Sequence, residues 1–268
     1  MASSLVEGAI PPPPGVTPIL GHAESPLRTT YSAALCVMLV FPATLVSLRL
    51  YTKTFLVWSW RKTDVACLVG FLWYIALIAV AFVVLNVGMG SHAWNLSPST
   101  FSRLVELLNI HQIIYMPSIT FTKIAILLQL KDIFSPLHLA RNPRWYLLYA
   151  MIVLNCVFFT VLLLLEIFQC IPRHKIWHHK AEGRCIDIKK TFVATGVINV
   201  VDDFIILVIP LVWTWQMQLR TRQKVGVSLI FATGLFACVT SVVRLAKSIQ
   251  CLGSPDISYT FAPVLLWA

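Results

Sequence analysis

Two adjacent aspartates, Asp202 and Asp203, stand in the apolar stretch GVINVVDDFIILVIP over residues 196–210. Carboxylates in such surroundings are costly to bury, so they mark either a path for a substrate, ion or proton, or a polar contact between helices. Adjacent side chains on a helix diverge by about 100°. The pair is therefore poorly placed to act as paired catalytic acids. Asn199 shares one helical line with Asp202 and the neighbouring line with Asp203, so we expect a polar face centred on Asn199.

Other ionisable residues interrupt apolar segments in the same way. Taking a rise of about 1.5 Å per helical residue, Lys123 reaches the depth of Asp64, so these two residues are expected to pair. By the same measure, Arg244 reaches the level of Glu106 or Glu166 near the opposite face. Such groups serve either as a charge path or as a structural lock between helices, and both interpretations stay open.

A line of polar residues accompanies these charges on the helix expected at 103–130. Helical spacing puts on one face the residues His111, Tyr115, Ser118 and Thr122. Hydroxyl groups at such positions serve either interhelical hydrogen bonds or a ligand. His111 could titrate near neutrality beside the aspartates, or serve only as a packing residue.

Cysteines and a glycosylation sequon point to one side of a membrane. Cys170 and Cys185 flank one basic loop, where a disulfide makes sense on the oxidising side, although Cys251 is a competing partner. Asn95 begins the sequence NLS and is a glycosylation acceptor if its loop is outside. The histidines of the basic loop match no complete zinc pattern, so no metal is expected; they are His174, His178 and His179.

The elements that position these residues follow from the composition. The 268 residues are 58% hydrophobic and 12% charged, with a mean hydropathy of +0.79. Apolar runs long enough to cross about 30 Å of hydrocarbon recur along the whole chain. Nothing resembles the alternation of a membrane barrel, and helices satisfy their own backbone groups. The sequence therefore predicts an all-α fold, a polytopic transmembrane helix bundle.

The helices are expected at 30–50, 64–87, 103–130, 145–170, 191–215 and 225–246, with a partial seventh at 259–268. The last run covers only about half of a crossing, so the seventh helix is incomplete in this chain. Residues 1–29 are expected to form a disordered, Pro-rich N-terminal tail. Residues 30–268 are expected to form one transmembrane domain.

The charge pattern sets the expected orientation. Basic residues in short loops favour the cytosolic side, but here they divide evenly between the two sides. Arg28 before the first helix stands against four basic residues after it, namely Arg49, Lys53, Arg61 and Lys62. Together with the loop cysteines, this predicts an extracellular or lumenal N-terminus in the plasma membrane or an endomembrane. The net charge of +10 favours the lipid bilayer as partner and gives no reason to expect nucleic acid.

Seven segments occur in a characteristic order: LRLYTK, KTD, GMGSHAWNL, FTKIAILLQLKDIF, CIPRHKIWHHKAEGRC, DDFIILVIP and GLFACVTSVVR. Over about residues 31–268 they resemble the fungal rhodopsin-like integral membrane family, which includes Pth-type receptor-like proteins. The resemblance implies a seven-helix rhodopsin-like architecture. It also implies that the family pattern is matched by the loop cysteines Cys170 and Cys185 and by Arg49, Asp64, His92, Lys123, Asp203 and Arg244. From this resemblance we expect Asp203 to join Asn199 in an interior polar network, with Asp202 at its margin.

Three functions from different classes fit these observations. The resemblance implies a receptor-like (GPCR-like) protein that senses an extracellular ligand by helix rearrangement, with a cytosolic signalling partner at the basic inner loops. The intramembrane Asp and Lys groups would instead suit a small membrane transporter. A membrane-embedded enzyme is the third class, and we expect no enzyme activity because the adjacent aspartates diverge. A retinal pigment needs a lysine in its last helix, and residues 259–268 contain none, so no cofactor is expected.

Overall fold

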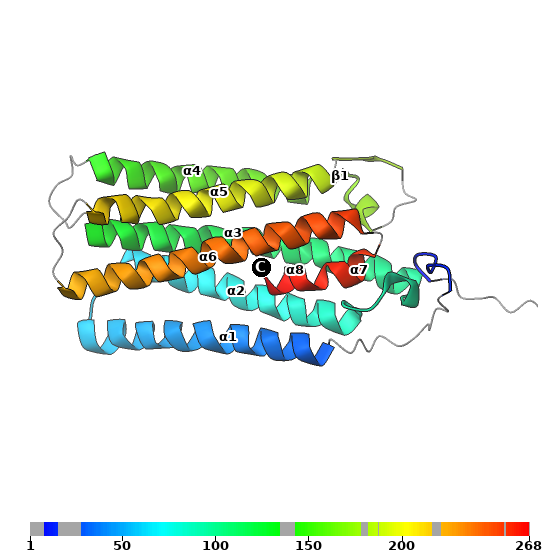
Figure 1. The fold of residues 1–268 in the computed structure, drawn as a ribbon, viewed down its shortest axis with the longest axis horizontal. Coiled ribbons are helices and arrows are strands. Elements are labelled where there is room, and N and C mark those ends of the chain that lie inside the picture. Colours follow the sequence, from blue (N-terminus) through cyan, green and yellow to red (C-terminus); the bar gives the residue numbers. More distant parts are fainter. Residues whose placement is uncertain are drawn as a thin grey trace, which may run out of the picture. The chain divides into compact units, whose positions relative to one another are not determined.

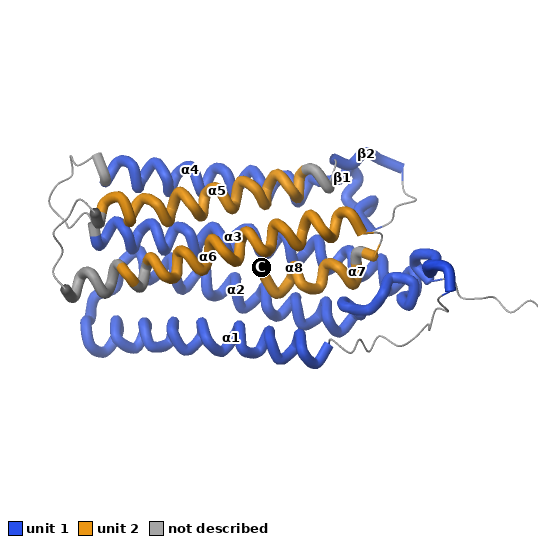
Figure 2. The backbone as a smooth tube through the Cα atoms, in the orientation of Figure 1, with its two compact units in different colours: residues 1–186 blue, residues 187–268 orange. Residues whose placement is uncertain are grey.

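The computed structural model describes residues 8–15, 28–134, 143–177, 182–186, 188–215, 221–254 and 256–267. Helices dominate these ranges, and six of the helices found there are long and apolar enough to cross a membrane. The structure therefore has the all-α, multi-pass architecture expected from the sequence. The chain divides into two compact units, residues 1–186 and residues 187–268 (Figure 2).

Unit 1 contains four long helices with short elements between and after them. The elements are α1 (Arg28–Tyr51), the π-helix η1 (Thr52–Val57), α2 (Lys62–Val87), the 3-10 helix η2 (Ala93–Asn95), α3 (Pro98–Phe134), α4 (Pro143–Ile167), β1 (Cys170–Ile171), the 3-10 helix η3 (Arg173–Ile176) and β2 (Arg184–Cys185). α3 packs against both α2 and α4, and α1 packs against α2 (Figure 1).

Small residues and buried apolar side chains hold these helices together. A Cβ added at Gly70 of α2 would lie 3.3 Å from the backbone nitrogen of Thr122 of α3. The glycine thus lets the two helix backbones approach closely, as small residues do in membrane bundles. The core of unit 1 includes a cluster of Leu77, Tyr115, Met116, Phe159 and Leu162 from α2, α3 and α4.

Local signals explain where α2 and α3 begin and end. Asp64, in the first turn of α2, accepts the backbone N–H of Arg61 at 3.1 Å, which satisfies a donor that the helix itself leaves unpaired. α2 ends at Gly88, whose φ of +126° favours glycine. Before α3, the hydroxyl of Ser97 accepts the backbone N–H of Thr100 at 3.2 Å.

The outer faces of the helices remain apolar. In α1 the buried residue is Leu35, whereas Phe41 and many other large apolar side chains of the same helix are exposed. Exposed apolar surface of this extent is unusual for a protein in water. In a membrane such side chains face hydrocarbon. A helix tolerates these surroundings because its backbone N–H and C=O groups are already paired inside the helix.

Unit 2 consists of helices only, within the residues described. They are α5 (Ile188–Trp215), α6 (Thr221–Gly253), α7 (Ile257–Thr260) and α8 (Ala262–Leu266). α5 packs against α6. Cβ atoms added at Gly196 of α5 and Gly234 of α6 would each lie 2.8 Å from a leucine methyl of the opposite helix. Both glycines therefore make room for side chains at the α5–α6 contact.

Several helix boundaries differ from the expected ones. α3 and α6 are longer than 103–130 and 225–246, because polar and capping residues beyond the apolar runs continue both helices. α4 ends at Ile167 instead of residue 170, because Cys170 belongs to β1. Apolar length identified the part of each helix that suits the membrane, and it gave no information on the polar turns outside.

The expected seventh helix over 259–268 is not confirmed. α7 and α8 are short and are interrupted at Phe261, and Pro263 at the start of α8 lacks a backbone N–H. Position 268 lies outside the described residues. Of the tail expected over residues 1–29, the structure describes 8–15, where Ala9 donates its N–H to Leu96 O at 3.0 Å, and the first two residues of α1. The rest of the tail lies outside the described residues.

Candidate functional site

Charged residues at one end of unit 1 gather around Asp64 of α2, whose side chain is 1% exposed. Arg49 of α1 places Nη2 2.9 Å and Nε 3.0 Å from Asp64 Oδ1. Lys53 Nζ lies 3.8 Å from Asp64 Oδ2. Arg49 also donates from Nη1 to Gln129 Oε1 of α3 at 3.1 Å. This Asp64 cluster (Asp64, Arg49 and Lys53) therefore ties α1, α2 and α3 together around a buried carboxylate.

The expected pair between Lys123 and Asp64 is not observed. Among the described residues, the ion-pair partners of Asp64 are Arg49 and Lys53. Equal depth along two helices was the basis of the expectation, but Gly70 of α2 packs against Thr122 and Thr63 bonds Asp132. Lys123 is therefore level with the part of α2 near Gly70 and not with Asp64. Arg49 lies in the last turn of α1, close in sequence to the start of α2. This position was the signal that Arg49 is the partner of Asp64.

A second, more exposed ion pair joins α2 and α3 at the same end. Arg61 Nη1 lies 3.6 Å from Asp132 Oδ2, with side chains 52% and 32% exposed. Thr63 donates its hydroxyl to the same carboxylate oxygen at 3.0 Å. Exposed ion pairs contribute little to stability because water solvates both partners. The buried Asp64 cluster is thus the stronger connection at this end.

Lys123 of α3 is buried, with 3% of the residue exposed. Its Nζ lies 5.0 Å from the centroid of the Phe159 ring of α4. A cation over an aromatic face is attracted by the negative charge of the ring face, and more strongly where water is excluded. Lys123 therefore connects α3 to α4, at the cluster that also contains Tyr115.

The expected polar line on α3 turns inward. His111, Tyr115 and Ser118 are all buried, with His111 1% exposed. Thr122 donates its hydroxyl to Ser118 O of the previous turn at 2.8 Å. The hydroxyl hydrogen of Thr122 is thus used in a bond within its own helix. Asn109 and Gln112 are also buried, but they lie two residues before and one residue after His111, so the spacing argument does not place them on this line.

The opposite end of unit 1 is closed by the disulfide between Cys170 and Cys185, which is confirmed, with Cα atoms 4.1 Å apart. The two cysteines face each other in the antiparallel β1–β2 ribbon. Ile186 donates its N–H to Gln169 O at 2.9 Å. Cys251, the competing partner, has a free thiol. We call this region the disulfide end of unit 1 and the region around Asp64 the Asp64 end.

Hydrogen bonds connect the disulfide end to α3. Arg173 of η3 donates from Nη2 to Asn109 Oδ1 at 3.4 Å. Asn109 in turn donates to Gln169 Oε1 at 3.4 Å. Ser102 donates its hydroxyl to Trp177 O at 2.9 Å. The loop therefore contacts α3 directly through Asn109 and Ser102, a connection that sequence analysis missed because partner loops are not encoded in helical spacing.

Within unit 2, Asp203 of α5 joins a polar network with α6. Ser241 donates its hydroxyl to Asp203 Oδ2. Asn199 Nδ2 lies 3.4 Å from both Asp203 Oδ2 and Ser241 Oγ. Asp202 and Asp203 are both half-buried. Sequence analysis did not identify Ser241 as part of this network, although its seven-residue spacing from Ser248 puts both serines on one face of α6.

Removing the Ser241 hydroxyl should weaken this network measurably. We expect Ser241→Ala to lower the free energy of unfolding by about 2 kcal/mol, because a hydrogen bond to a charged group in low dielectric is lost. The matched control is Thr240→Ala, whose hydroxyl bonds Ala237 O of its own helix at 2.8 Å. Unfolding in mixed detergent micelles measures both variants. Equal losses would show that Ser241 contributes no special contact to Asp203.

Three expectations remain as predictions. The pairing of Arg244 with Glu106 or Glu166 would join the two units, and Arg244 itself is half-buried on α6. Glycosylation of Asn95 concerns a residue of η2 at the disulfide end of unit 1.

Of the loop histidines, His174 lies exposed in η3, while residues 178 and 179 lie outside the described residues. Among the residues described, no group of three or more His, Cys, Asp or Glu could hold a metal ion.

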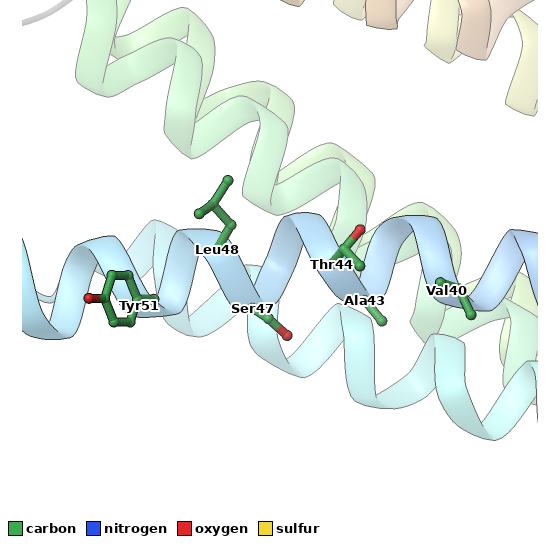
Figure 3. Close-up of a pocket in the computed structure, with 6 residues that line it drawn as sticks. All are labelled: Val40, Ala43, Thr44, Ser47, Leu48 and Tyr51. Carbon is green, nitrogen blue, oxygen red and sulfur yellow. The ribbon is translucent and has the colours of Figure 1, made fainter.

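A shallow groove of about 530 Å³ runs along α1 (Figure 3). Its lining comes from one helix, with Ala43, Thr44 and Ser47 between larger apolar residues. The Thr44 hydroxyl donates to Phe41 O of the same helix at 2.7 Å. No charged residue lines this groove. We therefore assign it no chemistry.

Residues 48–268 match the family model described as the fungal rhodopsin domain. A SAT4 family membrane protein of Emericella nidulans is 38% identical over 173 residues, which are 64% of this chain and 44% of the relative. The Fugralins biosynthesis cluster protein 2 of Gibberella zeae is 26% identical over 224 residues, 82% of this chain and 56% of the relative. The Wortmanamides biosynthesis cluster protein C of Talaromyces wortmannii is 22% identical over 211 residues, 74% of this chain and 56% of the relative.

The chain spans about half the length of these curated relatives. No solved structure matches it. The match to the family model covers every spanning helix except the first part of α1.

Proposed function

Because the chain belongs to the fungal rhodopsin domain family, we propose that this multi-pass membrane protein is a receptor-like sensor. A ligand at the disulfide end changes the position of α3, and the change reaches a signalling partner at the Asp64 end. Conformational coupling of this kind requires a ligand that binds two states with different affinity.

The observation that carries the proposal is that α3 makes polar contacts at both ends of unit 1. At the disulfide end, Asn109 bonds Arg173 and Gln169 over distances of 3.4 Å. At the Asp64 end, Gln129 accepts from Arg49 at 3.1 Å. Hydrogen bonds as long as 3.4 Å are weak and easily exchanged. A ligand that forms hydrogen bonds with Arg173 or Asn109 in place of these contacts would therefore shift α3 at small energetic cost.

The expected orientation of the chain in the membrane agrees with signalling from the disulfide end to the Asp64 end. The disulfide favours an oxidising compartment. Residues 8–15 belong to the same end, since Ala9 bonds Leu96 in the short connection before α3. We therefore propose that the N-terminus and the disulfide end are extracellular or lumenal. The Asp64 end then faces the cytosol, with its basic residues toward a partner there.

The ligand class is proposed by analogy with the relatives. Two relatives are named for the biosynthesis clusters of fugralins and wortmanamides. We propose that the ligand is a small organic molecule of the kind that such clusters produce. We also propose that the protein is no enzyme, because the diverging carboxylates of Asp202 and Asp203 leave no paired acids on one face.

A small transporter is the second candidate. The observation that favours it is the carboxylate of Asp203 within a helix that could span a membrane, in contact with Asn199 and Ser241. Intramembrane carboxylates of this kind serve proton and ion paths in transporters. A transporter would move its cargo across the bilayer in a way that depends on Asp203.

One experiment separates the two functions. The protein is purified and reconstituted in liposomes, and a panel of small organic compounds is screened for thermal stabilisation and then for flux. The receptor proposal predicts stabilisation without flux, together with ligand-dependent hydrogen exchange in residues 52–61 at the Asp64 end. Flux that falls in Asp203→Asn and persists in Asp202→Asn would establish the transporter and contradict the receptor.

Arg173→Gln tests the route through α3, with Arg184→Gln as the matched control. Both arginines belong to the elements around the disulfide, but Arg173 contacts Asn109, and Arg184 pairs with Ile171 in the ribbon. Only Arg173→Gln should reduce the exchange response at residues 52–61. An equal response in both variants would argue against coupling through Asn109.

A further inference from the structure

The Asp64 end of unit 1 contains a cavity of about 360 Å³. It lies where the last turns of α1, the start of α2 and the last turns of α3 meet (Figure 1). These are ends of helices long and apolar enough to cross a membrane. Ends of spanning helices lie at the depth of the lipid headgroups. The cavity is therefore placed at the level of headgroup phosphates.

Cationic groups outnumber carboxylates in this cavity. Its lining includes Arg49, Lys53 and Arg61 against Asp64 and Asp132. Arg49 already makes three close contacts, because Nε and Nη2 contact Asp64 and Nη1 donates to a glutamine of α3. These contacts hold its guanidinium in place, so Arg49 maintains the shape of the cavity.

Lys53 and Arg61 are held less tightly. Lys53 Nζ lies 3.8 Å from Asp64 Oδ2, with 23% of its side chain exposed. Arg61 Nη1 lies 3.6 Å from Asp132 Oδ2, with 52% of its side chain exposed. Both distances exceed ordinary hydrogen-bond lengths. An ammonium and a guanidinium with unused donors, directed at one cavity, are the groups that bind phosphate.

The segment that joins α1 to α2 carries both cations and also exposes apolar side chains. Its exposed side chains are Phe55, Leu56, Val57, Trp58 and Trp60, with Trp58 83% exposed. Tryptophan is enriched at the headgroup level of membranes, where its ring is partly apolar and its N–H is polar. Exposed apolar surface beside the cavity favours a lipid over a dissolved anion as the occupant.

We propose that this cavity binds the phosphate of an anionic phospholipid headgroup, with Lys53 and Arg61 as the phosphate-binding residues. Basic pockets between membrane helices at the headgroup level recognise anionic lipids in this way. The lipid site is separate from the ligand site at the disulfide end, and it does not depend on the sensing function. Lipid bound there would contact the starts and ends of three helices together.

Native mass spectrometry of the purified full chain tests the proposal by counting bound lipids. Phosphatidic acid is the probe and phosphatidylcholine is the reference, and the wild-type protein should bind phosphatidic acid more tightly. The Lys53→Gln/Arg61→Gln variant should bind phosphatidic acid more than about tenfold more weakly, since each cation contributes about fivefold. Unchanged affinity in this folded variant would overturn the proposal.

The matched control is Lys62→Gln/Lys131→Gln. It removes the same charge from the same ends of α2 and α3, but neither lysine lines the cavity. Its affinity for phosphatidic acid should stay within about twofold of the wild type. Equal weakening in the two double variants would mean diffuse attraction to positive charge, and the cavity would not be the site.

Inorganic phosphate distinguishes the lipid from a dissolved anion. It should not displace phosphatidic acid at equal concentration, because the apolar residues beside the cavity contact only the lipid. Displacement at equal concentration would assign the cavity to a dissolved anion and overturn the lipid assignment. If the double variant does not purify as a folded protein, Arg61→Gln alone should weaken binding about fivefold; unchanged affinity would again overturn the proposal.

Discussion

Replacing Asp64 with asparagine is expected to lower the free energy of unfolding by about 3 kcal/mol, because the positive charge of Arg49 loses its carboxylate partner. Asp64 is 1% exposed and Arg49 31% exposed, with Nη2 and Oδ1 2.9 Å apart. The partial exposure of Arg49 lets water solvate some of the unpaired charge, so the loss should fall at the lower end for buried pairs. Unfolding by SDS titration in mixed micelles measures it.

Asp132→Asn is the matched control for Asp64→Asn. Asp132 also pairs with an arginine and also lies at the Asp64 end, but its ion pair with Arg61 is exposed and 3.6 Å long. We expect a loss of about 1 kcal/mol, mainly from the weaker hydrogen bond of Thr63. Similar losses in both variants would contradict the view that burial makes the Asp64 cluster the main polar connection of α1, α2 and α3.

Removing the disulfide is expected to have an effect of similar size. Cys170 and Cys185 are separated by 15 residues, and closing a loop of this length lowers the entropy of the unfolded chain by an amount worth about 3 kcal/mol. The loss should appear in Cys170→Ser, in Cys185→Ser and in wild-type protein after reduction. Loss of η3 order should also break the contact between Arg173 and Asn109, and thus abolish the ligand response proposed above.

A double-mutant cycle isolates the bridge from the individual cysteines. If the bridge is the main contribution, Cys170→Ser/Cys185→Ser should cost little more than either single change. Cys251→Ser is the control for loss of a buried free thiol; because it keeps the bridge between Cys170 and Cys185, it should still lose about 3 kcal/mol on reduction, as the wild type does. Additive costs in the cycle would show that the two side chains matter mainly through separate packing contacts.

The long apolar runs predicted the spanning helices correctly because hydrocarbon allows few alternatives to a helix. Each of the six candidate spans contains most of an expected run. The end of the chain differs, because its last run is short and Pro263 interrupts the pattern of backbone donors. Periodicity placed both Asp202 and Asp203 near Asn199, since residues three and four apart are neighbours on a helix. The choice of Asp203 came from the family resemblance, and Asp203 contacts Asn199 at 3.4 Å.

The partners across helices were harder to predict. Lys123 and Asp64 were expected at one depth, but Asp64 pairs with Arg49 and Lys53, and Lys123 lies over Phe159. Depth depends only on position along one helix axis. Contact also depends on the rotation of both helices and on the reach of long side chains such as arginine.

Sequence alone thus specified the hydrocarbon surroundings of the helices, their approximate lengths and the faces that carry polar groups. These properties depend on local composition and on the helical repeat, so they can be read from one segment at a time. The tertiary structure decided that Arg49 neutralises Asp64, that Arg173 and Asn109 link the loop to α3, and that Lys53 and Arg61 share one cavity. Each of these contacts joins segments whose mutual rotation depends on packing of the whole unit.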